Sequence, residues 1–255
     1  MNKLIIILTF SIIILNSCNS DNKQIDNKVS NNISKTDTIV SEVDYGEISG
    51  FWLSKKYYND ILKYKNPKKS QEISTLSFIK INGKDRTALI AWNFHEGLTE
   101  NIDWKNGFLH INGNKISLFD NEFLYEKDTL IKFEIKNDKN ILNNLIFKGI
   151  YLNHNDTVRF YENGKIEGLD SVNYYIPMVD YMDAGRQVNQ ISLKENKNDI
   201  DFKDNNTFGF QFSGDTLFIY NLNCKQFEQD RCVVVEFGEL KYKLIKRMPN
   251  NVQNQ

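Results

Sequence analysis

The sequence has few of the residues that usually carry chemistry. Only three of its 255 residues are histidine and three are cysteine. His95, His110 and His154 do not have the i, i+4 spacing by which a helix presents two zinc ligands. The sequence also contains no Gly-x-Ser-x-Gly elbow, Walker loop, His-Glu-x-x-His or dinucleotide fingerprint. We therefore predict no catalytic residue, no metal site and no cofactor.

The sequence also lacks an excess of charge of either sign. It has 32 basic and 33 acidic residues, which give a formal net charge of −1. Nucleic-acid binding rests on clustered positive charge that displaces counterions from phosphates. Nucleic acid is therefore not a predicted partner.

There is one long hydrophobic run, and it is too short to remain in a bilayer. Leu4 to Leu15 follows Lys3 and is interrupted only by Thr9 and Ser11. A membrane-spanning helix needs about 20 apolar residues, whereas a signal peptide needs a basic start and a shorter apolar stretch. The run is therefore predicted to be a targeting segment.

The residues that end this run, Leu15-Asn16-Ser17-Cys18, resemble the bacterial lipobox. The resemblance implies cleavage before Cys18 and acylation of that cysteine, which anchors the chain to a membrane. Asn19 stands where an aspartate commonly retains lipoproteins at the inner membrane, so the outer membrane is favoured. The alternative is an ordinary secretory signal with an incidental cysteine.

Composition divides the rest of the chain. Residues 1–17 form the signal peptide, and 18–44 form an acylated, polar tether that cannot bury enough apolar surface to fold. Residues 45–248 form the folded domain, and 249–255 a polar tail. Within the tether, Asp37-Thr38-Ile39 resembles the acceptor of a periplasmic O-glycosylation system, which makes Thr38 a candidate glycosylation site.

The folded domain is predicted to be all-β. Short β-branched and aromatic runs alternate with turn signals, and Asn-Gly, which suits type I′ hairpins, occurs at residues 82–83, 106–107, 112–113 and 163–164. Sequential hairpins favour an antiparallel meander that closes into one barrel and so loses its edges. One helix is predicted after the first strand. Ser54 can cap its N-terminus, Asn66-Pro67 ends it, and one face carries Tyr57, Tyr58, Ile61 and Leu62.

The residues Gly50-Phe51-Trp52, followed at once by this helix, resemble the opening of the calycins, the group of lipocalins and fatty-acid-binding proteins. More broadly, the chain resembles bacterial lipoproteins with lipocalin-like domains. The resemblance implies that Trp52 closes a barrel floor, that the helix bearing Tyr58 is a lid, and that the barrel holds a lipid-like molecule. A simpler interpretation is that Trp52 is a core residue.

Three further candidates lie outside this motif. His95 follows a predicted strand, where a barrel mouth would lie. Tyr181 and Arg186 belong to Tyr174–Gln187, a segment in which Arg186 would bind a carboxylate or phosphate. The alternative is a structural turn in which Arg186 pairs with Asp180 or Asp183. Trp52, Tyr58, His95, Tyr181 and Arg186 are thus the candidate ligand-binding residues.

Cys224 and Cys232 flank a polar loop between two predicted strands. In an oxidising envelope compartment this spacing favours a disulfide that staples a hairpin.

These observations leave three hypotheses for a lipid-anchored envelope protein. The leading one is non-catalytic binding of a small apolar or amphipathic ligand inside the barrel. The second is a module with a filled barrel that binds another envelope protein. The third is a hydrolase that uses Asp180 and Asp183 as paired carboxylates.

Overall fold

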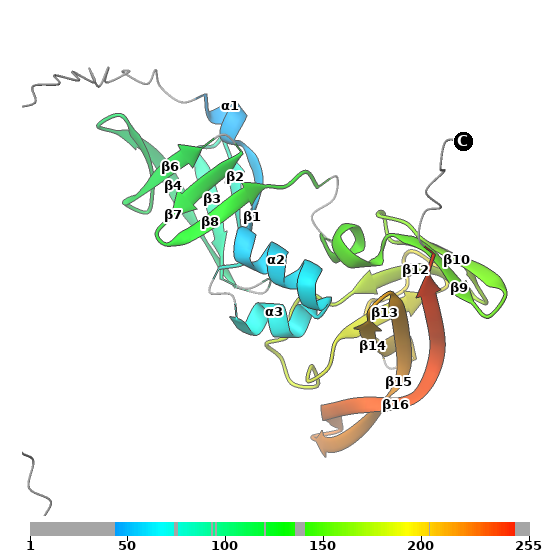
Figure 1. The fold of residues 1–255 in the computed structure, drawn as a ribbon. Coiled ribbons are helices and arrows are strands. Elements are labelled where there is room, and N and C mark those ends of the chain that lie inside the picture. The colour runs from blue at the N-terminus through cyan, green and yellow to red at the C-terminus, as the bar shows by residue number, and fades with distance from the viewer. Residues whose placement is uncertain are drawn as a thin grey trace, which may run out of the picture. The chain divides into compact units, whose positions relative to one another are not determined.

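The computed structural model describes residues 44–247, except 74–75, 93, 95, 120, 136–140 and 204. The chain forms two closed, eight-stranded antiparallel barrels, each a meander in which the last strand pairs with the first (Figure 1). The predicted all-β class and antiparallel barrel closure are therefore confirmed. The single barrel expected over residues 45–248 is corrected to two, because pairing of β1 with β8 closes the first eight strands on themselves.

The first barrel contains short strands. They are β1 (Gly50–Ser54), β2 (Phe78–Asn82), β3 (Thr87–Ala91), β4 (Gly97–Lys105), β5 (Phe108–Ile111), β6 (Asn114–Phe119), β7 (Glu122–Tyr125) and β8 (Asp128–Lys132). Asn106-Gly107 and Asn112-Gly113 both have positive φ at each residue, as predicted for type I′ turns. Asn82 and Asn163 do not have positive φ, so the other two Asn-Gly pairs belong to different turns.

Side chains fill the interior of the first barrel. Trp52 and Phe123 lie with their ring centroids 4.6 Å apart, and both are buried. Trp52 Nε1 donates to the carbonyl of Ile48 (2.8 Å), which ends the short helix α1 (Tyr45–Ile48). Aliphatic residues of the other strands complete this core: Ile79, Ile81, Ile90, Ile102, Leu109, Ile111, Ile116 and Leu130.

Two helices follow β1. The predicted one is α2 (Lys55–Tyr64), and the Ser54 side chain accepts from Tyr57 N as the expected N-cap. It ends at Lys65, whose left-handed conformation (φ 47°) returns its N–H to Ile61 O. A second helix, α3 (Pro67–Ile73), was not predicted. Pro67 suits its first position, because the N–H that proline lacks would have no partner within the helix there.

The second barrel has much longer strands at its C-terminal end. After the π-helical turn η1 (Asn143–Phe147) come β9 (Gly149–Asn153), β10 (Asp156–Phe160), β11 (Lys165–Leu169), β12 (Val172–Pro177), β13 (Gln190–Lys194), β14 (Thr207–Ser213), β15 (Thr216–Glu228) and β16 (Arg231–Lys246). Pairing of Leu152 with Ile245 closes the barrel. The sequence around Leu145, Ile146 and Phe147 is rich enough in apolar residues to suggest a strand, but these residues belong to η1.

Aromatic side chains fill the second barrel. Phe147 of η1 is fully buried, and its ring lies 5.0 Å from Phe210 and 5.6 Å from Tyr175. Tyr57 and Ile61 of α2 belong to the same cluster. The helix predicted as a lid therefore packs its buried face into the core that includes the second barrel.

Candidate functional site

The structure separates the predicted ligand-binding residues. Trp52 is only 3% exposed and belongs to the core of the first barrel, as in the simpler interpretation. Tyr58 lies half-buried on α2, with its ring 6.3 Å from Phe133. Cys18, Thr38 and His95 lie outside the described residues. The remaining candidates, Tyr181, Arg186 and the two cysteines, come together in the second barrel.

Arg186 forms a structural turn with both neighbouring carboxylates. Its Nη1 donates to Asp180 Oδ2 (3.2 Å) and to the Asp180 carbonyl (2.9 Å), and its Nη2 pairs with Asp183 Oδ2 at 3.1 Å. Two negative charges therefore compensate one guanidinium. Such a group presents no net positive charge to a carboxylate or phosphate, and the two aspartates are held as partners of Arg186. This is the turn that was considered as the alternative.

Tyr181 anchors the start of the same loop. Its N–H donates to Gln71 Oε1 of α3 (3.2 Å), and its hydroxyl donates to the carbonyl of Met178 (3.0 Å). Burial raises the pKa of Tyr181 well above its ordinary value, so the hydroxyl stays protonated. Tyr181 therefore acts as a fixed hydrogen-bond donor to its own loop.

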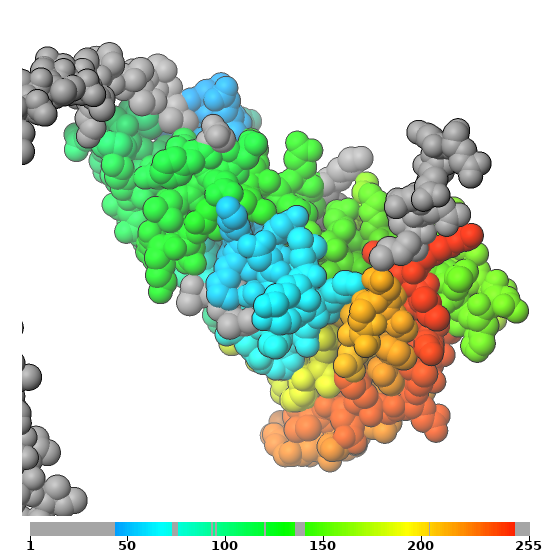
Figure 2. Space-filling model, in the orientation of Figure 1, coloured from blue at the N-terminus to red at the C-terminus, as the bar shows by residue number. Residues whose placement is uncertain are grey.

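Beside this loop, β15 and β16 continue past the end of β14. We call residues 221–239 the arm. The pairing of Gly209 with Tyr220 marks the last register of β14 on β15, whereas β15 and β16 remain paired as far as Glu228 and Arg231. Figure 2 shows that this part of the chain, in orange, lies at the molecular surface. The turn at its tip uses Gln229 and Asp230, both with positive φ.

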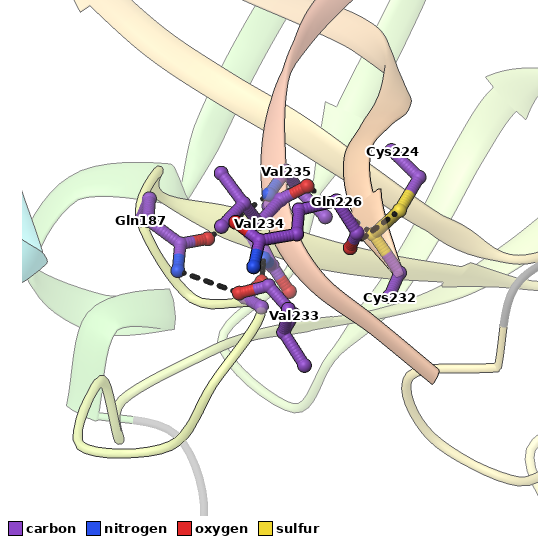
Figure 3. Close-up of a disulfide and its surroundings, with 9 residues drawn as sticks. Gln187, Cys224, Gln226, Cys232, Val233, Val234 and Val235 are labelled. Atoms are coloured by element: carbon purple, nitrogen blue, oxygen red, sulfur yellow. Dashed lines mark hydrogen bonds between the residues drawn. A yellow bond between two sulfur atoms is a disulfide. The ribbon is translucent and has the colours of Figure 1, made fainter. Parts of the chain in front are cut away.

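A disulfide and an ion pair join the two strands of the arm. The predicted disulfide between Cys224 and Cys232 is present, with the two Cα atoms 5.7 Å apart (Figure 3). Lys225 Nζ pairs with Glu236 Oε2 at 2.5 Å across the two strands. Phe227, close to the tip, has no such support and is 67% exposed. The arm is thus a covalently stapled hairpin that presents an aromatic ring to solvent.

Gln187 covers the outer edge of the arm. Its amide Nε2 donates to the carbonyl of Val233 (2.9 Å), and its Oε1 accepts from Val235 N (3.0 Å), as Figure 3 shows. Gly185 N also donates to Val233 O (2.8 Å). One side chain thereby satisfies an edge that would otherwise expose unpaired backbone groups.

The loop and the arm enclose a small cleft of about 320 Å³, which Arg186, Gln190 and both half-cystines line. Among the described residues, no three His, Cys, Asp or Glu side chains are grouped as metal ligands. None of the described helices is long and apolar enough to span a bilayer. Because Asp180 and Asp183 compensate the charge of Arg186, the cleft presents no net positive charge from this side chain to an anion.

Sequence reasoning identified the disulfide and the unusual loop but not what they support. The signal for the arm was the run of β-branched and aromatic residues on both sides of the two cysteines, interrupted by Gly238 and Glu239. The structure instead has one strand, β16, over that region. Gln187 could not have been found, because its role depends on a register set by the fold.

Comparison with protein-family models, with curated proteins and with solved structures finds no match, so the function is inferred from the geometry.

Proposed function

We propose that the protein is a non-catalytic interaction module of the bacterial cell envelope, anchored through a lipid on Cys18 and facing a protein partner through the arm. The lipobox-like residues and Asn19 support the anchor and favour the outer membrane. The polar residues 18–44 then provide the tether between the lipid and the folded part.

The observation that carries this proposal is the arm. Ordering a hairpin costs conformational entropy, and a barrel recovers that cost through burial. Most arm residues are exposed, so burial does not explain their order. A disulfide, an ion pair and the Gln187 contact hold the arm instead. Rigid presentation of Phe227 lowers the entropy lost on binding, and aromatic anchors commonly dominate protein interfaces.

The interiors of the barrels also favour an interaction module over a carrier that encloses a ligand, because side chains fill them. The largest buried side chains of the second barrel include Tyr151, Phe160, Tyr175 and Phe210, all at 1% exposure or less. They occupy the space that a carrier barrel leaves for its ligand. This is the arrangement of the second sequence-based hypothesis.

Site-specific photo-crosslinking tests the role of the arm. A photoreactive amino acid would replace Phe227 in the full chain, expressed in its native envelope, and Phe119 would serve as a matched position. Phe119 is also an exposed aromatic residue, at 63%, but lies on the first barrel. We expect one discrete protein adduct from position 227 that is absent at position 119 and diminished in a Cys224→Ser/Cys232→Ser background. Equal labelling from both positions would contradict the proposal.

A small apolar ligand remains a second candidate, favoured by one pocket. Trp104, Leu109, Ile116 and Leu118 line a hollow of about 270 Å³ in the first barrel. Leu109 lies directly opposite both Trp104 and Ile116, so these side chains share the face that the core residues occupy. The hollow is below the size typical of ligand pockets, which is about 300 to 1,000 Å³.

Native mass spectrometry tests this second candidate with a matched pair of variants. Leu118→Glu places a charge in the pocket, and Leu124→Glu places one at a residue of equal exposure that does not line it. A bound apolar molecule would appear as an added mass that leaves on denaturation. It should be lost in Leu118→Glu and kept in Leu124→Glu. The same mass in both variants would exclude this pocket.

A further inference from the structure

A cavity larger than the arm's cleft lies at the end of the second barrel where β11 turns into β12 and β13 leads to β14. It has a volume of about 650 Å³. The turn at Asp170-Ser171 and the long β13–β14 loop form its walls. We call it the mouth groove. None of the residues that sequence reasoning selected lines it.

Strand register shows why the floor of the mouth groove is aromatic. Tyr242 lies directly opposite Ile219, and Phe208 lies directly opposite Ile191; both isoleucines are fully buried. Opposite residues on paired strands share a face, so Tyr242 and Phe208 belong to the inward-facing rows of the barrel. They are the last members of these rows and remain half-exposed. The filled core therefore ends in a partly open aromatic floor.

The buried ammonium group of Lys194 holds the loop that forms one wall of the groove. Lys194 is only 4% exposed, and its Nζ donates to the carbonyls of Lys197 (2.9 Å) and Asp199 (3.0 Å) and to Asp201 Oδ1 (2.6 Å). Desolvating an ammonium is costly unless its donors are satisfied, as they are here. This cation fixes the course of a loop that has little apolar side-chain burial of its own.

A second polar contact set fixes the other half of the loop. Asn206 Oδ1 accepts from Ser192 Oγ (3.1 Å) and from Lys203 N (2.9 Å), while Asn206 Nδ2 donates to Ile200 O (2.9 Å). The side chain of Ile200, in contrast, is 62% exposed at the groove. The wall is thus set before any ligand arrives, which lowers the entropic cost of binding.

The described residues of the groove include acidic and basic side chains in equal number, although the charge of Lys194 is already paired with Asp201. The described lining contains three acidic and three basic residues: Asp170, Glu195, Asp199, Lys194, Lys203 and Lys241. Within the described part of the chain, the side-chain amides of Asn196, Asn198 and Asn205 make no protein hydrogen bond, and all three are exposed. Each such amide offers two donors and an acceptor to a ligand.

From this combination we propose that the mouth groove binds a neutral oligosaccharide. Sugar hydroxyls both donate and accept, so they match free amides mixed with carboxylates and ammonium groups. The apolar C–H face of a sugar ring can lie on the Tyr242 and Phe208 rings, which offer flat apolar surface. The balanced charge argues against anionic ligands, and the polar walls argue against fatty acids.

Tyr242 also has a suitable protonation state. Burial, and then the negative charge of Asp170, raise the pKa of Tyr242 above its ordinary value, so the hydroxyl remains a donor at neutral pH. Lys241 Nζ lies 4.8 Å from the Phe208 ring centroid and 5.7 Å from that of Tyr242. The same cation therefore borders both rings of the floor.

Isothermal titration calorimetry tests the proposal on the full chain in micelles of a detergent without a sugar headgroup. The probes are maltohexaose, cellohexaose and chitohexaose, with hexagalacturonate as the charged comparator. We expect at least one neutral probe to bind. Tyr242→Ala should weaken it about tenfold or more, which corresponds to about 1.4 kcal/mol. Asn198→Ala, at an exposed and unbonded side chain, should weaken binding without affecting the fold.

Tyr220→Ala is the matched control. Tyr220 is half-exposed on β15 and stacks on Phe237 at 4.8 Å, but does not line the groove. Its loss should leave the affinity unchanged. The proposal fails if no neutral probe binds at about 10 mM, an affinity too weak to serve as recognition. It also fails if hexagalacturonate binds more tightly, or if Tyr220→Ala weakens binding as much as Tyr242→Ala.

Discussion

The two barrels share one topology and differ in what is added to it. Each is an eight-stranded meander closed by pairing of its last and first strands. In the first barrel every strand has between four and nine residues, whereas β15 and β16 of the second have 13 and 16. Closure already satisfies the edges of a barrel. The extra length in the second barrel therefore calls for an explanation other than folding, and we assign it to binding.

The two barrels also differ in their aromatic residues. All three tryptophans, Trp52, Trp92 and Trp104, lie within residues 50–132, the span of the first barrel. The second barrel has none and is packed with phenylalanine and tyrosine. Tryptophan fluorescence therefore follows the unfolding of the first barrel, and tyrosine absorbance is more sensitive to the second. The two signals allow the experiments below to compare the barrels.

The largest expected effect comes from removing the aromatic centre of the second barrel. Phe147 is fully buried among Phe160, Tyr175, Phe210 and Phe212. Phe147→Ala should destabilise the protein by about 3 to 5 kcal/mol through lost burial and a cavity. Denaturant unfolding followed by far-ultraviolet circular dichroism measures this loss.

Phe119→Ala is the control for this prediction, because the Phe119 side chain is exposed and should cost less than about 0.5 kcal/mol. If the barrels unfold separately, the tryptophan transition should stay in place in Phe147→Ala. A stability loss no larger than that of the control would show that η1 does not complete the second core.

The sequence predicts the parts of these barrels and that a barrel closes, but not which strands close it. The Ser54 cap and the turns at residues 106–107 and 112–113 are local, since they depend on residues next to one another. Strand β4 has a weak sequence signal, because most of its residues are exposed and only Ile102 is buried, so apolar and polar residues do not alternate along it. Pairing of β1 with β8 joins residues about 80 positions apart, and no local pattern specifies it.

The candidate sites likewise divide into those set by residues close in sequence and those set by the fold. The spacing of Cys224 and Cys232 predicted a disulfide, and the structure contains it. The Arg186 turn was recognised as an alternative because its acidic partners are near in sequence. The mouth groove could not be predicted from the sequence, because Phe208 and Tyr242 become neighbours only through two strand registers, that of β14 on β15 and that of β15 on β16. Its one sequence signal was the length of the polar segment after Lys194.

Alkaline pH should affect the second barrel more than the first. Burial raises the pKa of Tyr151 and of Tyr175, both fully buried in the second barrel. In the unfolded chain these hydroxyls ionise near pH 10, whereas in the folded chain they stay protonated. The unfolded state thus binds fewer protons above pH 10, and stability falls as pH rises, by about 1.4 kcal/mol per pH unit for each tyrosine.

Stability measured between pH 9 and pH 11 checks this sign. Tyr175→Phe should reduce the slope above pH 10, because it removes one of the buried tyrosines whose pKa is raised. Tyr161→Phe is the control, since Tyr161 is half-exposed and no comparable burial acts on it. A stability that stays constant up to pH 11 would contradict the prediction.

The smallest expected effect separates the arm from the barrel that carries it. Gln187→Ala removes the two hydrogen bonds of this side chain to the outer edge of β16, so that Val235 N loses its partner and Val233 O keeps only Gly185 N. Because the site is exposed, water can replace the amide, so the global stability should fall by only about 1 kcal/mol. Amide hydrogen exchange should nevertheless accelerate at Val235, while exchange within β1–β8 stays unchanged. Gln211→Ala, an exposed glutamine on β14 without such contacts, should change neither. If Val235 exchanges at the same rate in Gln187→Ala and the parent chain, Gln187 does not hold the arm, and the disulfide and the Lys225–Glu236 ion pair are sufficient.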